Sequence, residues 1–338
     1  MSLQTHNEIE LEKALKELTS TQMGRRLFLQ AAPLLIAGAC ATKSSKERLR
    51  EGDNSGQKTE LTPEDERKLT AEVLPQMKKD YPAIQNAELQ SYVNNIGQRI
   101  VRANNMGGKP YTYTFTAVDV NYVNAFALPA GTVMVTAPLI TMAESEAELA
   151  GVIGHEIGHI KARHTAERME MAKQSEKKTW LYGAVGGLLG GAAGFGLGKM
   201  LCKPKDNECL QKAALYGAAA GAGGGLLIQK YAFMANSRED EMEADRIGFR
   251  TSLAAGYDRN HVGTFYSKLL EMEKKAKGDG NKLLASVTDA MSTHPPSEQR
   301  VKQMNQMAAE APLKTGAIVS TKEFEKMQAL ASRYGKKA

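Results

Sequence analysis

The sequence has few cysteines, three in 338 residues, which is too few for a scaffold held together by many disulfides. It also lacks the usual signs of nucleic-acid binding: we find no basic run, zinc knuckle or aromatic RNA-binding motif. The 44 lysines and arginines exceed the 38 acidic residues by six, and this excess is spread along the chain. Hydrophobic residues make up 42% and charged residues 24%, which is ordinary for a folded protein. We therefore expect a folded protein that binds no nucleic acid.

The N-terminal region has the layout of an export signal. The pair Arg25–Arg26 precedes an apolar stretch that ends in small residues before Cys40, and this stretch is shorter than the ~20 residues that span a bilayer. We predict a lipoprotein-type signal peptide over residues 1–39, with Cys40 as the lipidated first residue of the mature protein. The arginine pair also resembles a twin-arginine signal, while a start at Met23 would leave a compact ordinary lipoprotein signal. A buried N-terminal helix with an incidental cysteine is the alternative.

The residues after Cys40 predict how the mature protein is attached. Residues 40–60 are rich in Lys, Ser, Glu and Gly, a composition typical of a flexible tether. Ala41 follows the cysteine, at a position where Asp would retain a lipoprotein at the inner membrane. The resemblance to bacterial lipoproteins therefore implies a periplasmic protein that the lipidated Cys40 anchors to the outer membrane.

Residues 61–338 predict a single domain that is mostly helical with one small sheet. This interpretation rests on three signals: capping residues, apolar stripes of helical period, and one alternation of aromatic residues with threonines. The predicted elements are a helix starting at Thr62, a helix near 86–104, strands at 111–117 and 133–135, and helices from Ser145 onward.

Glycine is concentrated in one segment. Residues 181–228 hold 13 of the 31 glycines, and many of these recur every four residues on either side of a short polar loop. This spacing places small residues on one helical face, so we predict an inserted Gly-rich helical hairpin. Cys202 and Cys209 lie at its tip and would form a disulfide in an oxidising periplasm. A flexible Gly/Ala loop is the alternative, because glycine costs about 1 kcal/mol at each helical position.

An HExxH motif indicates a metal site. His155 and His159 are one helical turn apart, so both imidazoles can hold one zinc ion. Glu156 would then flank the metal and accept a proton from the attacking water. A third histidine at the spacing of metzincins is absent, because His164 is displaced by one residue. We interpret His164 as a residue behind the ligands or on the surface.

The other common third ligand is a carboxylate on a later helix. The acidic segment 236–248 is such a helix, and Glu241 and Asp245 share one of its faces. One of the two could bind zinc while the other orients a histidine through its ring N–H. Spacing alone leaves the choice open among three glutamates: Glu239, Glu241 and Glu243.

Four separated motifs carry a family resemblance. They are HEIGH at 155–159, SRxxExEAD at 237–245, NAFALPAG at 124–131, and HPPS at 294–297 followed by Arg300. Together they resemble the HtpX/CAAX-protease family of zinc metallopeptidases, in particular its soluble periplasmic branch of the BepA and LoiP type. The resemblance implies an α+β, zincin-like (gluzincin) fold that binds one Zn²⁺. It implies Glu241 as the third ligand and Asp245 as the carboxylate behind the ligands. The stretch after the HPPS motif is too short for the helical repeat domain of BepA, so we expect that domain to be absent.

His294 has several interpretations. From the residues alone it is a loop histidine held by Pro295 and Pro296. The resemblance implies an active-site role, because the equivalent histidine in the periplasmic branch can occupy the open position at the zinc and inhibit the enzyme. A histidine in that place could instead donate a hydrogen bond to the transition-state oxyanion.

These features predict a zinc-dependent endopeptidase of the bacterial cell envelope that hydrolyses unfolded or misassembled proteins. We expect the substrate to lie extended against an edge strand around Ala130–Thr136, where backbone hydrogen bonds tolerate many sequences. One alternative is a chaperone-like assembly factor whose metal site is gated and rarely active. The other is a structural zinc protein with four ligands and no role for Glu156.

Overall fold

Helices dominate the part of the chain that the computed structural model describes, which is residues 51–171, except 56, 58 and 109, and residues 236–336, except 277–286, 288, 289 and 292. The elements are α3 (Pro63–Asp80), α4 (Ala87–Ala103), β1 (Thr114–Val118), β2 (Ala125–Leu128), the 3-10 turn η1 (Pro129–Gly131), β3 (Thr132–Thr136), α5 (Ala137–Met142), α6 (Glu146–Lys161), α11 (Arg238–Ala254), α12 (Thr264–Ala276), α14 (Glu298–Glu310) and α15 (Lys322–Ala331). The prediction of a mostly helical protein with one small sheet is confirmed.

Several predicted features lie outside the described residues. They are the signal peptide at 1–39, the first part of the tether with Cys40, and the hairpin at 181–228 with Cys202 and Cys209. Within the described ranges, no helix is both long enough and apolar enough to cross a bilayer.

The predicted helix starts are realised by side-chain caps. Thr62 accepts a hydrogen bond from the backbone of Asp65, whose carboxylate accepts one from the Thr62 N–H in return, and α3 begins at Pro63. Asn86 caps α4 and Ser145 caps α6 through the same kind of contact to the residue three positions on. These caps satisfy backbone N–H groups that have no partner inside the helix.

The sheet has the strand order β1-β3-β2. β3 pairs in parallel with β1 and antiparallel with β2, so both of its backbone edges are hydrogen-bonded. The expectation of an edge strand around Ala130–Thr136 is therefore wrong, because a strand paired on both sides has no free edge to offer a peptide. Among the described strands, β1 and β2 are the edges, and β2 leads directly into η1.

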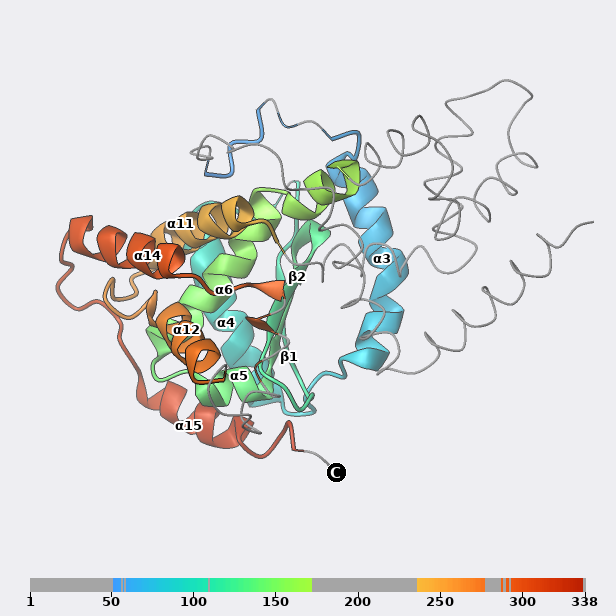
Figure 1. Ribbon diagram of the computed structural model, residues 1–338. Coiled ribbons are helices and arrows are strands. Elements are labelled where there is room, and N and C mark those ends of the chain that lie inside the picture. The colour runs from blue at the N-terminus through green and yellow to red at the C-terminus, as the bar shows by residue number, and fades with distance from the viewer. Residues whose placement is uncertain are drawn as a thin grey trace, which may run out of the picture. The chain divides into compact units, whose positions relative to one another are not determined.

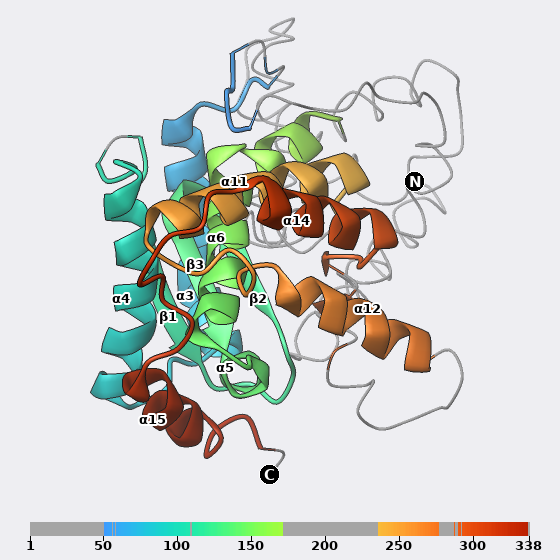
Figure 2. The same cartoon turned by 90° about the vertical axis from the view of Figure 1, so that its left-hand side faces the viewer.

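The helix that carries the HExxH motif lies at the centre of the packing. Figure 1 shows α3 on one side of the sheet and α4 and α6 on the other. Residues Glu146–Ile160 of α6 are all buried, and the most extensive contact between described elements joins α6 to α11. In Figure 2, α11 crosses α6 and α14 lies beside α11. This crossing brings two segments that are about 80 residues apart into one site.

Glycines at the crossing let the two backbones approach. A Cβ added to Gly158 on α6 would lie 2.8 Å from the carbonyl oxygen of Ala244 on α11. A Cβ added to Gly248 would lie 2.6 Å from the backbone nitrogen of His155. Both distances are shorter than van der Waals contact allows, so side chains at these positions would force the helices apart.

The residues that precede α3 also contact α6. We call the described residues between Glu51 and Leu61 the strap. Most of them fall in the stretch predicted as a tether, and the side chains of Asn54 and Gln57 each donate to a backbone carbonyl at the end of α6, at 2.9 Å. The last carbonyls of a helix have no partner within the helix, so external donors bind there readily.

Candidate metal centre

Four side chains from three segments converge beside the α6–α11 crossing. They are His155 and His159 of α6, Glu241 of α11, and His294 in the loop before α14, and one ligand atom from each lies within 4.8 Å of the others. The Nε2 atoms of His155 and His159 are 2.9 Å apart, and each is 3.3 Å from an oxygen of Glu241. The structure thus brings together all three predicted metal ligands.

The charges in this group are set by burial and by each other. Burial and the neighbouring His155 hold the pKa of His159 well below its ordinary value, which favours the neutral imidazole. Burial disfavours a charge on His155 as well, but the Glu241 and Asp245 carboxylates outweigh burial and raise its pKa to about 9. Burial also opposes the charge of Glu241, yet the Arg300 guanidinium and two imidazoles lower its pKa well below the ordinary range.

The donor set fits a zinc ion. Two imidazoles and one carboxylate are a donor combination typical of catalytic zinc, and all three side chains are buried. Their ligand atoms face one another, and gathering buried polar groups in this way is costly unless a bound ion or other charge compensates them. His294 adds a fourth donor, because its Nδ1 lies 3.2 Å from His155 Nε2 and 3.1 Å from Glu241 Oε1.

Glu156 lies beside the same group. It follows His155 on α6, is buried, and places Oε1 at 3.4 Å from Nε2 of His294. Burial raises the pKa of the Glu156 carboxyl. A carboxyl with a raised pKa is suited to take and return a proton near neutral pH.

Asp245 supports His155 from behind. Its Oδ1 is 2.9 Å from Nδ1 of His155, the ring nitrogen that faces away from the other donors. Burial opposes its charge, but the Arg300 guanidinium outweighs burial and lowers the pKa of Asp245. The carboxylate can therefore accept the ring N–H and hold the imidazole in one tautomer and orientation.

Arg300, which the sequence marks only as part of a motif, makes several contacts that spacing does not predict. Its guanidinium is buried, donates to Asp245 at 2.8 and 2.7 Å, and lies 2.7 Å from Glu241. It also donates to the carbonyl of Pro295 at 3.1 Å, which ties the His294 loop to the same carboxylates. The Tyr266 ring lies beneath it, 4.6 Å away. An arginine six residues after His294 was the only signal in the sequence.

The three glutamates that spacing left open have different surroundings. Glu241 joins the donor group, Glu243 lies 3.3 Å from His164, and Glu239 has a partly exposed side chain 3.9 Å from Arg238. His164 is fully buried, which agrees with a place behind the ligands and excludes the surface.

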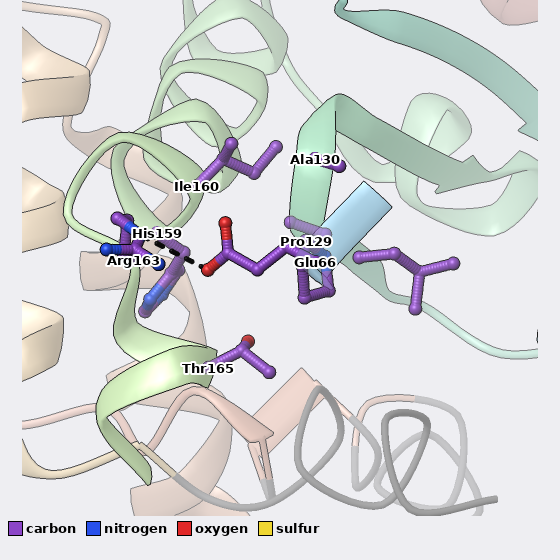
Figure 3. Close-up of a pocket in the computed structure, with 9 residues that line it drawn as sticks. Glu66, Pro129, Ala130, His159, Ile160, Arg163 and Thr165 are labelled. Carbon is purple, nitrogen blue, oxygen red and sulfur yellow. Dashed lines mark hydrogen bonds and ion pairs between the residues drawn. The ribbon is translucent and has the colours of Figure 1, made fainter. Parts of the chain in front are cut away.

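A small pocket opens next to His159, between the β2–η1 segment and the end of α6. Figure 3 shows the Glu66 carboxylate there, joined to Arg163 at 3.3 Å. Burial raises the pKa of Glu66, which also accepts a hydrogen bond from Tyr111. The lining residues are Glu66, Ala127, Leu128, Pro129, Ala130, His159, Ile160, Arg163 and Thr165. The pocket therefore lies between the β2–η1 segment and His159.

Comparisons with known proteins agree with this geometry. Residues 87–308 match peptidase family M48. A beta-barrel assembly-enhancing protease from Escherichia coli (strain K12) is 28% identical over 249 residues, which are 74% of this chain and 44% of that protein. A putative beta-barrel assembly-enhancing protease from Vibrio cholerae is 30% identical over 236 residues, 70% of this chain and 42% of that protein.

A third relative comes from a plant. The mitochondrial metalloendopeptidase OMA1 of Arabidopsis thaliana is 30% identical over 184 residues, which cover 54% of this chain and 29% of that protein. The chain thus spans less than half the length of each of these three relatives.

Proposed function

Because this chain belongs to peptidase family M48, as the four motifs predicted, we propose that it is a zinc-dependent endopeptidase with the gluzincin arrangement of ligands. His155, His159 and Glu241 would hold the zinc ion. The observation that carries the proposal is the group of buried donors, with the Glu156 carboxylate beside it.

Each residue then has a defined task. Zinc in such a site supplies Lewis-acid chemistry, polarising the scissile carbonyl and lowering the pKa of the attacking water. Glu156 accepts the proton of that water and passes it to the leaving amine, for which its raised pKa is suited. Asp245 and Arg300 hold His155 and Glu241 in place. Burial of the group strengthens these interactions.

The substrate would lie extended along β2 rather than along β3. β2 is an edge of the described sheet and leads through η1 to the pocket beside His159. Backbone pairing with an edge strand needs an unfolded segment and reads little of its sequence. We therefore propose unfolded or misassembled envelope proteins as substrates. The names of the bacterial relatives, which are proteases that enhance beta-barrel assembly, support this class.

We place the protein in the periplasm, anchored to the outer membrane by a lipid on Cys40. The arginine pair, the short apolar stretch and the small residues before Cys40 support this proposal. The relation to proteases that enhance beta-barrel assembly favours the same compartment.

The substitution Glu156→Gln tests the mechanism. It removes the proton acceptor but leaves the donor group, so zinc content should stay at one ion per chain while cleavage of casein, an unfolded protein, falls by about 10²–10⁴-fold. The measurements are metal analysis and a fluorescent casein assay on the purified chain. Casein cleavage at the wild-type rate by the variant would refute the proposed role of Glu156.

A chaperone-like assembly factor with a gated metal site is the second candidate. The position of His294 favours it, because Nδ1 of His294 lies among the ligand atoms, where a catalytic site keeps one position open. A structural site with four ligands is less favoured, because it gives the buried Glu156 no role.

A further inference from the structure

A chain of polar contacts leads from His159 away from the donor group. Its Nδ1 is 2.8 Å from Nδ1 of His164, and Nε2 of His164 is 3.3 Å from Oε2 of Glu243. The other oxygen of Glu243 accepts the backbone N–H of Gly52, in the strap, at 2.9 Å. If Nε2 of His159 binds the metal, its Nδ1–H donates to His164, whose Nε2–H then donates to Glu243. With one tautomer of each ring, every hydrogen bond in this series from His159 to Glu243 has a donor and an acceptor.

His164 reaches this position through an unusual backbone turn. α6 ends at Lys161, and Arg163 has a φ of 56°, a left-handed conformation that non-glycine residues seldom adopt. The turn returns His164 towards His159, five residues earlier. Such a conformation persists when its surroundings hold it.

Contacts with the strap stabilise this backbone conformation at Arg163. The Arg163 guanidinium lies 3.5 Å from the side-chain oxygen of Gln57 and donates to the carbonyl of Leu61. Gln57 donates its amide to the carbonyl of Ala162, and Asn54 donates to that of Lys161, so the strap binds the backbone on the N-terminal side of the turn. Figures 1 and 2 both show the strap, in blue ahead of α3, beside one end of α6.

We propose that the strap is a positioning element of the metal centre. It fixes the turn at Arg163 and the carboxylate of Glu243, and through His164 these fix the orientation of His159. The two zinc-binding histidines thus have different supports: Asp245 holds His155 directly, whereas a relay that ends in the N-terminal segment holds His159. This inference rests on the proposed metal site.

A double-mutant cycle on zinc affinity tests the relay. One arm is the strap variant Asn54→Ala/Gln57→Ala, and the other is His164→Leu, with His164→Gln in its place if the leucine variant does not fold. Gln85→Ala is the matched control, because Gln85 also donates to a backbone carbonyl, that of Ala83, but far from the relay in sequence and exposed. Zinc affinity of the full chain is measured by competition with a chromogenic chelator, and the absorption spectrum of bound Co²⁺ reports ligand geometry.

Each arm should weaken zinc binding by about 10-fold or more and change the cobalt spectrum, as loss of outer support does at other metal sites. The combined variant should bind zinc within about 2-fold of the His164 variant, because the strap acts through that residue. Gln85→Ala should bind like the unsubstituted chain.

Two results would overturn the relay while leaving the proposed function intact: unchanged zinc affinity and cobalt spectrum in the strap variant, or losses that multiply in the combined variant. Absence of zinc binding by the unsubstituted chain would instead reject the metal site itself, and the relay with it.

Discussion

Four of the five acidic residues at positions 239–245 of α11 have different partners. Glu241 meets the donor group, Asp245 supports His155, Glu243 meets His164, and Glu239 lies near Arg238. Helical spacing predicted that Glu241 and Asp245 share a face, but it could not rank Glu239, Glu241 and Glu243. The ranking depends on which of them faces α6, and this is a property of the crossing of two helices.

His294 is the residue whose removal distinguishes a gate from a catalytic donor. The substitution His294→Ala takes a fourth nitrogen away from the ligand atoms, so casein cleavage should rise several-fold if His294 closes the site. Zinc affinity should fall at the same time, because one donor is lost. The measurements are the casein assay and a chelator competition on the purified variant.

A fall in the cleavage rate of the His294→Ala variant would point to a catalytic role. A His294→Ala rate that is lower by about 10²–10³-fold, at full zinc content, would show that His294 stabilises the oxyanion and does not gate the site. An unchanged rate would contradict both roles.

At the scale of elements, the site depends on how closely α6 and α11 approach. Glycine on one helix faces the backbone of the other, so the donors of α6 and α11 meet because no side chain separates the two axes at this point. The HExxH periodicity predicted the helix and its histidine pair. It did not predict that α6 would be buried on all sides, because its apolar stripe indicated only one buried face.

Gly158→Ala tests this dependence. The new methyl group would meet the Ala244 carbonyl oxygen at 2.8 Å, and backbone on both sides can shift little. The free energy of unfolding should fall by about 1–3 kcal/mol, the usual cost of overpacking, and casein cleavage should fall because His159 is displaced. Urea unfolding followed by circular dichroism measures the first effect.

Gly107→Ala is the matched control. A Cβ there meets only Val101 Cγ1 at 3.9 Å, which is ordinary contact, so the free energy of unfolding should change by less than about 0.5 kcal/mol. Equal stability of the Gly158 variant and this control would contradict the close-packing argument.

At the scale of the whole molecule, the proposed anchor precedes the strap by few residues. Cys40 is separated from Glu51 by ten positions, so the proposed lipid attachment is joined to the strap by a short stretch of sequence. The described part of the chain contains the metal-binding donor group, the residues that position it and the edge strand β2. The anchor and the glycine-rich hairpin remain predictions from sequence.

Cys40→Ser tests the anchor. Without the thiol no lipid can be attached, so the protein should move from the membrane pellet to the supernatant after cell fractionation and should lose incorporation of labelled palmitate. Cys202→Ser, which changes a cysteine outside the signal, serves as the control and should stay in the pellet. Membrane association of the Cys40 variant with unchanged palmitate labelling would argue against lipidation at this residue.

The sequence by itself determined the helix with its two histidines, the mostly helical class and the family, because each depends on spacing within one segment or on motifs read in order. The tertiary structure decided what spacing left open: that Glu241, which the resemblance implied, meets these histidines, that β2 and not β3 is an edge, and that Arg300 and His164 stand behind the ligands. These facts depend on contacts between segments tens of residues apart. Local periodicity carries no information about such contacts, because it describes which face is buried and not what lies against it.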